Sequence, residues 1–467
     1  MKALNYPPIF RNRIFYALCL MAMLCLAACE KFIQVDAPKN QLTAKAVFEN
    51  EATANAALSS LYTKAVGFVN GSYNSASLLA AQSSDENECW STNLAVQQVF
   101  QNQMLPSNSY ASALWTNGYE TIYYANAILE GTSDNPKLSS PSINQLQGEA
   151  LFFRALAQLT LTNFFGPVPL VTSTDYQVNT RLPQSSNAQV LAAVASDLQK
   201  AKSLLPADYV IGANERIRAN HYAASALLAR VYLYQQQWTL AEQEASILIN
   251  ATTVFSLPTL SEVFLKNSRE TILSYKPYAT NQNTGDGNVY VLTAKPNYTA
   301  MRKSFADGFE SGDQRRTAWV GKVTAAGVDY FFPNKYKVKT SATLSEYSII
   351  LRLAEQYLIR AEARARLDQL PQAISDLDLV RFRAGLSKIA NTNPTIGKDA
   401  LLDAILMERR SELFTEWGHR WMDLRRFGKL VAVLGPIKPG FQATAALYPI
   451  PQSELNVNPS LVPNPGY

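Results

Sequence analysis

Two histidines are the only imidazole groups in the 467-residue chain. His221 opens a stretch with helical patterning, and His419 follows Gly418 in an arginine-rich segment. Neither belongs to an H-E-x-x-H pair, so a histidine-ligated metal site is not expected. The chain also shows no G-x-S-x-G nucleophile turn and no glycine-rich phosphate loop. The sequence therefore predicts no metal, no cofactor and none of the enzyme classes that depend on these motifs.

Acidic side chains form two short clusters that could bind a cation. Residues 85–88 (Asp-Glu-Asn-Glu) and 285–288 (Gly-Asp-Gly-Asn) offer carboxylate and amide oxygens, the ligands that Ca²⁺ prefers. Neither completes a twelve-residue calcium loop, so a polar loop is the better interpretation of both. Glu86 and Glu88 could in principle serve glycoside hydrolysis, which needs two carboxyl groups at a set separation. Nothing in the sequence favours this pair.

Aromatic residues are the more informative group, with 23 Tyr, 20 Phe and 6 Trp, accompanied by many Asn, Gln, Ser and Thr. A flat ring stacks on the C–H face of a sugar, while amide and carboxylate groups hydrogen-bond its hydroxyls. Such a surface suits a neutral polymer that is bound without being cleaved.

The charge balance excludes nucleic acid as a ligand. The formal net charge is +5 at pH 7, and it includes Lys2, Arg11 and Arg13 in a segment expected to be removed. The remaining 39 basic and 37 acidic residues nearly cancel, whereas binding to DNA or RNA depends on clustered Lys and Arg. With 47% apolar and 17% charged residues, most of the chain should fold, as one large or two moderate domains.

The first 28 residues have the pattern of a secretory signal peptide. A basic start precedes an apolar run from Ile14 to Ala28, which is shorter than the roughly twenty residues that a membrane-spanning helix needs. The run ends in Leu26-Ala-Ala-Cys29, which resembles the lipobox of bacterial lipoproteins and implies cleavage before Cys29 and acylation of its thiol. Only Cys89 of the four cysteines would then stay free, so no disulfide framework is expected.

Helical patterning dominates the rest of the chain. Residues 29–45 are predicted to be a polar tether and 46–467 a folded body, with an N-terminal part of about 46–250 and a C-terminal part of about 251–467. Loops and small strands, including 270–275 and 289–293, are expected between about Thr252 and Ser341. The predicted helices are Glu51–Lys64, Tyr110–Glu130, Ile143–Phe164, Ala188–Leu204, Asn220–Gln236, Thr239–Asn250, Ser345–Arg366, Pro371–Ala384 and Asp399–Trp417.

Two helix pairs look like copies of one unit. Residues 229–241 align with 361–373 without a gap, at an offset of 132, and place small residues at both ends of each segment. Small residues let antiparallel helices approach closely, so the pattern resembles a tetratricopeptide repeat. The fold class predicted from these features is mainly α, with tetratricopeptide-like hairpins and long loop-rich and short β insertions.

Several motifs are given structural roles. Glu408, Glu412 and Glu416 recur at every fourth residue, within reach of Arg409 or Arg420. Arg352 and Glu355 are spaced for an internal ion pair, and Gly166 with the two following prolines should end the preceding helix.

These segments, in order, resemble the SusD/RagB-like family of outer-membrane nutrient-binding lipoproteins. The resemblance runs from the lipobox to the last residue. The segments that carry it are Glu51–Lys64, Trp115–Leu129, Gly148–Leu156, Asn163–Leu170, Arg352–Ala363, Glu408–Gly428, Tyr448–Leu455 and Asn464–Tyr467. It implies a SusD-like fold with a shallow site built from the loop after the first helix, Ser83 to Asn108, and from the irregular middle region, Tyr290 to Trp319.

The ligand-binding residues expected in these two loops are Asp85, Trp90, Asn93, Tyr298 and Trp319. Trp90 is singled out because it lies in a polar context, where a purely structural tryptophan is less expected. Trp319 also fits a packing role.

The resemblance implies a non-catalytic lipoprotein, anchored through Cys29 in the outer membrane and facing outward. It would bind a glycan or oligosaccharide and deliver it to a SusC-like TonB-dependent transporter. Three alternatives remain: the same fold binding peptides, as RagB-type relatives imply, an unrecognised secreted glycoside hydrolase, and a scaffold that binds only protein.

Overall fold

The computed structural model describes residues 44–69, 72–277 and 281–467. The predicted signal peptide, the lipid attachment site at Cys29 and most of the predicted tether lie outside these ranges. Across the described ranges, no helix combines the length and apolar character needed to cross a membrane.

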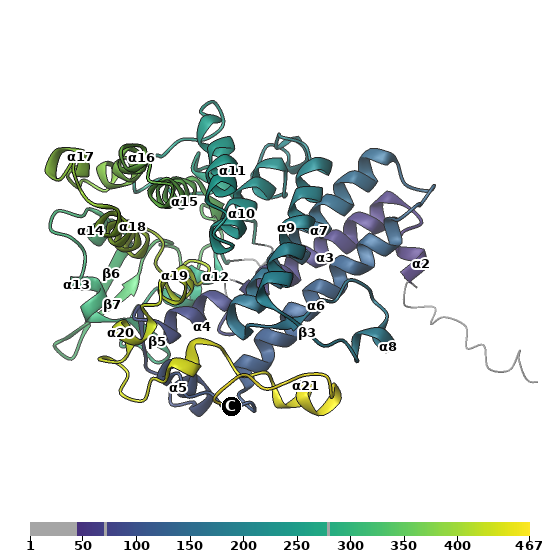
Figure 1. Cartoon of the computed structure of the whole chain (residues 1–467), viewed down its shortest axis with the longest axis horizontal. Helices are drawn as coiled ribbons and strands as arrows, with labels where there is room; N and C mark the ends of the chain where they lie inside the picture. Colours follow the sequence, from purple (N-terminus) through teal and green to yellow (C-terminus); the bar gives the residue numbers. More distant parts are fainter. Residues whose placement is uncertain (1–43, 70–71, 278–280) are drawn as a thin grey trace, which may run out of the picture.

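Long helices form most of the fold, which confirms the predicted mainly α class (Figure 1). Those of the first half lie side by side, with α7 in contact with α3, α6 and α9. Most of α7 is buried, as expected for a helix that is enclosed by others. The long helices of this half are α3 (Glu51–Val69), α6 (Ser109–Thr132), α7 (Ser140–Phe165), α9 (Asn187–Leu204), α10 (His221–Tyr234) and α11 (Trp238–Asn250).

Helix ends follow local sequence signals. Helix α7 stops at Phe165, and the next residue, Gly166, adopts φ +77°, a conformation that favours glycine. The predicted stop is confirmed. Helix α9 begins with a capping box, in which the Ser186 side chain accepts from the Gln189 N–H and the Gln189 side chain accepts from the Ser186 N–H.

The two predicted hairpins are structurally equivalent. Helices α10 and α11 form one, and α15 (Leu353–Arg366) with α16 (Leu370–Arg383) forms the other. Their turns place Gln236 at φ +59° and Asp368 at φ +62°, at the 132-residue offset read from the sequence. In each turn the next backbone N–H donates to a helix carbonyl at 2.9 Å: Gln237 donates to Tyr232, and Gln369 donates to Arg364. Helix α11 packs on α15, so the hairpins stack as tetratricopeptide units do.

Shorter helices complete the helical part of the fold. The C-terminal third contains α17 (Ile389–Thr392), α18 (Lys398–Glu412), α19 (His419–Arg426), α20 (Leu430–Leu434) and α21 (Gln452–Val457). The remaining helices are α2 (Ala44–Val47), α4 (Ala76–Ser83), α5 (Leu94–Gln101), α8 (Tyr176–Asn179), α12 (Gly285–Tyr290), α13 (Lys303–Asp307) and α14 (Arg315–Trp319), with 3₁₀ turns η2 (Val210–Gly212) and η3 (Ala443–Ala446).

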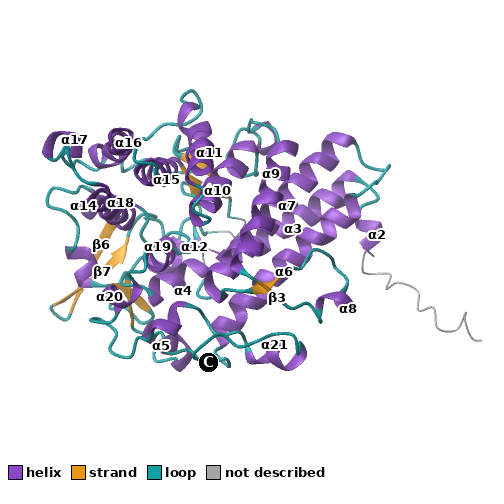
Figure 2. Ribbon diagram, viewed as in Figure 1, coloured by secondary structure: helices purple, strands orange, loops and turns teal. Residues whose placement is uncertain are grey.

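Three small antiparallel sheets accompany the helices (Figure 2). The largest has the order β1-β5-β7-β6, and the others pair β2 with β3 and β4 with β8. The strands are β1 (Asn87–Cys89), β2 (Val168–Pro169), β3 (Gln184–Ser185), β4 (Thr271–Tyr275), β5 (Thr299–Met301), β6 (Val320–Ala325), β7 (Val328–Pro333) and β8 (Ser348–Arg352).

Three predicted elements differ from the structure, and one of them, the helix expected at Asp399–Trp417, ends early, at Glu412. The helix expected from Ser345 begins only at Leu353, because residues 348–352 pair with β4 as strand β8. That strand contains Ile349 and Ile350, and β-branched side chains favour strands. Conversely, the strand expected at 289–293 is partly helical, since α12 runs to Tyr290.

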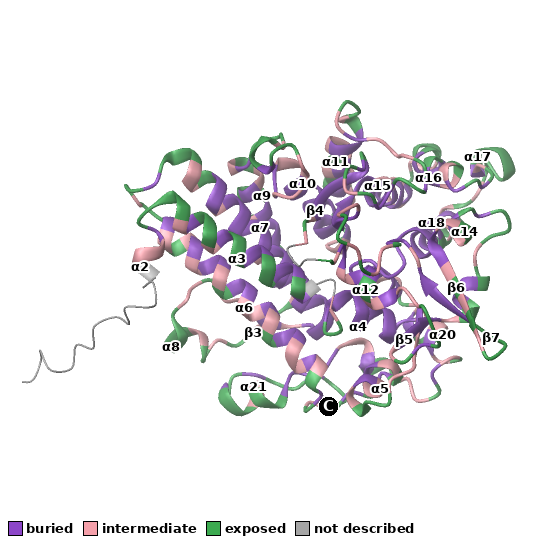
Figure 3. Ribbon diagram, turned by 180° about the vertical axis from the view of Figure 1, so that it is seen from behind, coloured by how far each residue is buried: buried purple, intermediate pink, exposed green. Residues whose placement is uncertain are grey.

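The main hydrophobic core draws on both halves of the chain (Figure 3). Phe152 from α7 and Trp421 from α19 are both fully buried in it. Tyr448 joins them, and its hydroxyl lies 2.7 Å from the Ser83 hydroxyl. The proposed division of the body near residue 250 remains a prediction.

Candidate functional site

Strands β1 and β5 bring together the two loops predicted to form a site. Asn87, Glu88 and Cys89 pair with Met301, Ala300 and Thr299 in antiparallel register. Just beyond the ladder, the Trp90 N–H donates to the Tyr298 carbonyl at 2.8 Å. Trp90 and Tyr298, two of the predicted site residues, are thus neighbours although 208 positions separate them.

Four aromatic rings gather around this junction, and we call them the Trp90–Tyr298 cluster. Tyr73 packs edge-on against Tyr298, with ring centroids 4.4 Å apart, and Tyr330 packs edge-on against Trp90 at 5.2 Å. Tyr73 is 45% exposed, whereas Trp90 and Tyr298 are partly exposed and Tyr330 is nearly buried. The cluster therefore presents fixed aromatic edges and faces to solvent, supported from below by Tyr330.

Polar groups border the cluster. The Lys295 ammonium lies 5.7 Å from the centre of the Trp90 ring, within cation–π range. The Trp90 Nε1 is shielded from solvent and has no hydrogen-bond partner among the described residues. Asn93, the third predicted site residue, is exposed at the start of α5, where its side-chain oxygen accepts from the Ala95 and Val96 N–H groups. Its Oδ1 is used as a helix cap.

Asp85 precedes β1 by two residues, and its carboxylate is already engaged. Arg420 donates to both Asp85 oxygens at 2.8 Å, and the Arg410 Nε is 3.7 Å away. Burial alone would raise the pKa of Asp85, but its hydrogen bonds with Arg420 and the charges of both arginines lower it. The Asp85 side chain is only 13% exposed, so the structure gives it a positioning role rather than direct contact with a ligand.

Trp319 does not belong to the site, which corrects the prediction that it contacts ligand. It is 1% exposed, and its indole N–H donates to the Leu260 carbonyl at 2.9 Å. Its ring packs against Phe264 and Phe414 in a separate hydrophobic cluster. A ring without an exposed face has no surface on which a ligand could stack, so Trp319 has the packing role that its sequence context also allowed.

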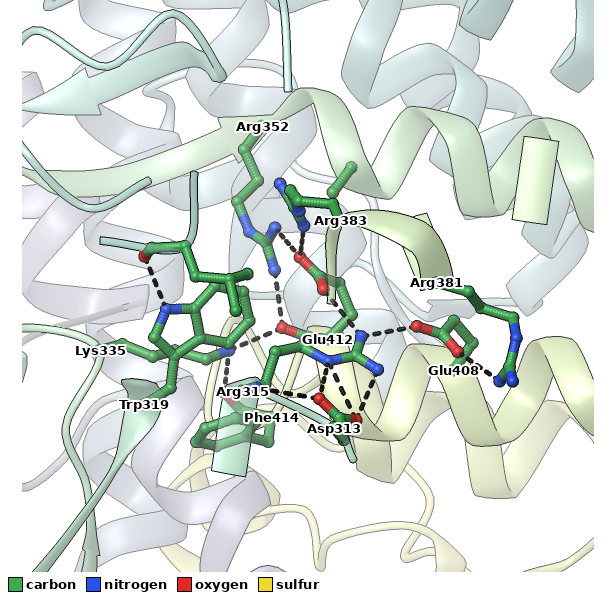
Figure 4. Close-up of polar contacts among 12 residues, drawn as sticks. Asp313, Arg315, Trp319, Lys335, Arg352, Arg381, Arg383, Glu408, Glu412 and Phe414 are labelled. Carbon is green, nitrogen blue, oxygen red and sulfur yellow. Dashed lines mark hydrogen bonds and ion pairs between the residues drawn. The ribbon is translucent and has the colours of Figure 1, made fainter. Parts of the chain in front are cut away.

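A buried network of acids and bases lies beside Trp319 (Figure 4). Arg352 pairs with Glu270 at 2.7 Å, Glu412 at 2.6 Å and Glu416 at 2.7 Å. Arg315 bridges Glu412 and Glu408, and the side chains of both arginines are at most 2% exposed. Burial alone would raise the pKa of Glu412, but its cationic neighbours hold it well below its usual range. These carboxylates are paired with arginines and largely closed to solvent, which suits a structural role.

The network corrects the predicted ion pairs. Arg352 does not contact Glu355, which instead pairs with Arg230 at 2.6 Å. Arg409 pairs with Asp423, and Arg420 pairs with Asp85. Neither arginine therefore forms the predicted ion pairs with the glutamates at every fourth position. These arginines pair with carboxylates from other segments and not with the neighbours that helical spacing favours, because buried charges need full neutralisation.

Sequence reasoning missed Tyr73, Tyr330 and Lys295. Tyr73 follows α3 after a short Gly-Ser segment, and Tyr330 is the first aromatic of a Tyr-Phe-Phe run in β7. Nothing local separates these tyrosines from the other 21, since the pairing of β5 with β7 is what brings Tyr330 to Trp90.

Metal-binding chemistry finds no support in the described part of the chain, where no group of three or more His, Cys, Asp and Glu side chains could hold an ion. His419 is buried, and burial together with nearby arginines holds its pKa well below its usual range.

Comparison with known proteins identifies the family. Residues 31–233 match a family model described as "Starch-binding associating with outer membrane", and residues 275–467 match the SusD family model. A SusD-like protein from Formosa agariphila is 27% identical over 431 residues, which cover 79% of this chain and 83% of the relative.

Solved structures agree. A SusD superfamily protein from Bacteroides vulgatus superposes with a TM-score of 0.78 at 22% identity, covering 90% of this chain and all of the other, which shows the shared fold. A structure titled "Laminarin binding SusD-like protein" gives a TM-score of 0.74 at 27% identity with the same coverage. The motifs, the stacked hairpins and these matches lead to one conclusion: the chain belongs to the SusD/RagB-like family.

Proposed function

We propose that the protein is a non-catalytic, lipid-anchored glycan-binding protein of the outer-membrane surface, which passes its ligand to a SusC-like TonB-dependent transporter. The observation that carries the binding function is the Trp90–Tyr298 cluster. It holds two partly exposed rings and the exposed Tyr73 in fixed orientations around one strand junction. Preformed aromatic surfaces bind sugar rings at little cost in conformational entropy.

The choice of a glycan as ligand has two further supports. One relative with 27% identity is named for laminarin binding, and a fold neighbour is named "Surface glycan-binding protein A from Bacteroides uniformis". The nearly balanced charge of the predicted mature chain is compatible with a neutral ligand.

Capture without cleavage fits the acidic groups beside the cluster. A glycosidase needs one carboxyl group to donate a proton and a second to attack or to activate water. Here Asp85 is held by Arg420, and Glu86 is 1% exposed and accepts from the Thr415 N–H at 2.9 Å. Neither is placed to reach a ligand on the rings, and Glu88, which is partly exposed on β1, would be a single carboxyl group where two are needed.

The lipid anchor and outward orientation rest on the sequence from Leu26 to Cys29 and on the family. Radiolabelled acyl chain incorporation that is lost in Cys29→Ala would support the anchor. Protease digestion on intact cells tests surface exposure, and co-purification with an outer-membrane transporter tests the partner.

Binding is tested by calorimetry with soluble laminarin, starch fragments, other neutral polysaccharides and a set of peptides. We expect Trp90→Ala and Tyr298→Ala each to weaken binding of the preferred glycan at least tenfold. Phe382→Ala is the matched control, because Phe382 is 65% exposed on α16 and lies outside the cluster. Unchanged affinity in both cluster variants would remove the site, preference for peptides would change the ligand class, and release of reducing sugar would reveal an enzyme.

A further inference from the structure

A second aromatic-lined cleft lies between α6, the segment from Pro169 to Thr180 and α21. Its volume is about 290 Å³, just below the range of about 300 to 1,000 Å³ for drug-sized ligand sites, so it suits a small group. Trp115, Tyr119 and Tyr123 line it from α6, Tyr176 lines it from α8 and Glu454 lines it from α21. None of these residues takes part in the Trp90–Tyr298 cluster, and the cleft has no role in the proposed function.

The rings of this cleft differ in how they are held. Trp115 is buried, and its ring centroid is 4.9 Å from that of Tyr119. The Tyr119 hydroxyl donates to the Pro169 carbonyl at 3.0 Å, which fixes that ring as the floor. Tyr123 and Tyr176 are 53% and 71% exposed, so they form walls that keep free ring surface. Positions 115, 119 and 123 are four apart and share one face of α6.

One strong acceptor in the cleft is unused. The Glu454 carboxylate has no hydrogen bond or ion pair with any described residue, whereas the side-chain amides around it already donate hydrogen bonds. The Asn179 amide donates to the Ser173 carbonyl and the Asn458 amide to the Leu182 carbonyl, each at 2.9 Å. Burial raises the pKa of the Tyr119 phenol, and the negative charge of nearby Glu454 raises it further. The cleft thus pairs exposed ring faces with a free carboxylate, an arrangement that suits a ligand with hydroxyl donors and disfavours an anion.

The two aromatic sites lie on different sides of α6. Tyr110, near the start of this helix, lies beside Tyr298 of the first cluster. Tyr119 of the cleft lies nine residues after Tyr110. At 100° and 1.5 Å per residue, these two positions lie on opposite sides of the helix and about 14 Å apart along its axis. A short ligand on one site therefore does not continue into the other, and the two should act independently.

We propose that this cleft is a second binding site that takes a single sugar ring of a neutral glycan, stacked between Tyr123 and Tyr176 with its hydroxyls donating to Glu454. The inference rests on the proposed function, because it assumes that the protein binds neutral glycans. It adds a second contact point, so that a long polymer can engage the protein twice and gain avidity.

The test counts binding sites by calorimetry with short laminarin or starch oligosaccharides. We expect two sites per chain in the unaltered protein and one in Tyr123→Ala/Tyr176→Ala, with a tenfold or greater loss of affinity at the second site in Glu454→Gln. Val178→Ala is the matched control, because Val178 is 53% exposed on the same helix as Tyr176 but does not line the cleft. Trp90→Ala should keep the second site.

Each outcome separates this inference from the proposed function. If calorimetry finds one binding site per chain and Trp90→Ala abolishes it, the cleft is not a second site. The proposed function would still stand. Cleft variants that lose co-purification with the transporter but keep both glycan sites would assign the cleft to a protein contact and also overturn it. No binding of any glycan would end the proposed function, and the inference with it.

Discussion

Arg420 holds both carboxylate oxygens of Asp85 at 2.8 Å, although 335 residues separate them. The pair ties α19, near the C-terminus, to the turn that leads into β1 and Trp90. Both side chains are largely buried, with exposed fractions of 6% and 13%. The orientation of the first aromatic cluster therefore depends on a contact with the last part of the chain.

Arg420→Met should destabilise the fold by about 3 kcal/mol or more, because it leaves a mostly buried carboxylate without its main partner. Chemical denaturation measures the loss. The double variant Asp85→Ala/Arg420→Met should lose less than Arg420→Met alone, since no charge is then stranded. Lys64→Met is the control: Lys64 pairs with Glu120 on the surface, with 45% and 43% exposure, and its loss should cost at most about 1 kcal/mol. Equal effects of Arg420→Met and Lys64→Met would contradict the assignment.

Glu86 should make the protein less stable as the pH rises from about 4.5 to 7. Burial raises the pKa of Glu86 to about 7, against the opposing effect of the Thr415 N–H. Below pH 4.5 the group is protonated in both the folded and unfolded chains, and above pH 7 the folded state bears the full cost of the buried charge, on the order of 3 kcal/mol. Glu86→Gln removes this cost while keeping an acceptor for Thr415.

Thermal melts across pH check this prediction. The variant and the parent should melt together near pH 4.5, and the variant should melt several degrees higher at pH 8. A constant difference between them at every pH would contradict a titrating Glu86.

Trp319→Ala should destabilise the fold by about 3 to 5 kcal/mol, because it empties a buried ring site and removes the hydrogen bond to Leu260. Under conditions where the variant stays folded, its affinity for glycan should match the parent. Trp90→Ala should show the reverse, with a small change in melting temperature and a large loss of affinity. A specific affinity loss in folded Trp319→Ala would restore Trp319 to the site.

The hairpin turn offers a backbone test. Gln236 has φ +59°, which costs a non-glycine residue about 1 kcal/mol, whereas the preceding Gln235 has φ −78°. Gln236→Gly should therefore raise the free energy of unfolding by up to about 1 kcal/mol, and Gln235→Gly should lower it by about 0.5 to 1 kcal/mol. Denaturant titration of the two variants side by side decides the matter. Destabilisation of the same size in both would show that the left-handed turn is not strained.

The sequence predicted most helices and the hairpin equivalence, because both depend on local spacing. The small residues at Ala229 and Ala361 signalled the repeat, and both are fully buried. Strand β8 escaped prediction, since its run of apolar residues also fits a helix and only pairing with β4 decides between the two.

The candidate site was predictable in part. Trp90 stood out in a polar segment, and the family resemblance pointed to the loop with Tyr298. Trp319 looked similar from its neighbours, but its burial depends on Phe264 and Phe414, which are distant in the sequence. Tyr73 and Tyr330 could not be selected because their membership follows from tertiary contacts alone.

The stacked hairpins have an evolutionary consequence. The interval between Gln236 and Asp368 contains strands β4 to β8, and with them Lys295, Tyr298 and Tyr330. Because α11 packs on α15, this interval leaves and re-enters a closed helical scaffold, much as an antibody loop leaves its framework. Exposed positions of this interval, such as Lys295, can therefore vary without disturbing the stacked repeats, whereas its buried residues Arg315 and Arg352 are tied to Glu412 of α18 and cannot.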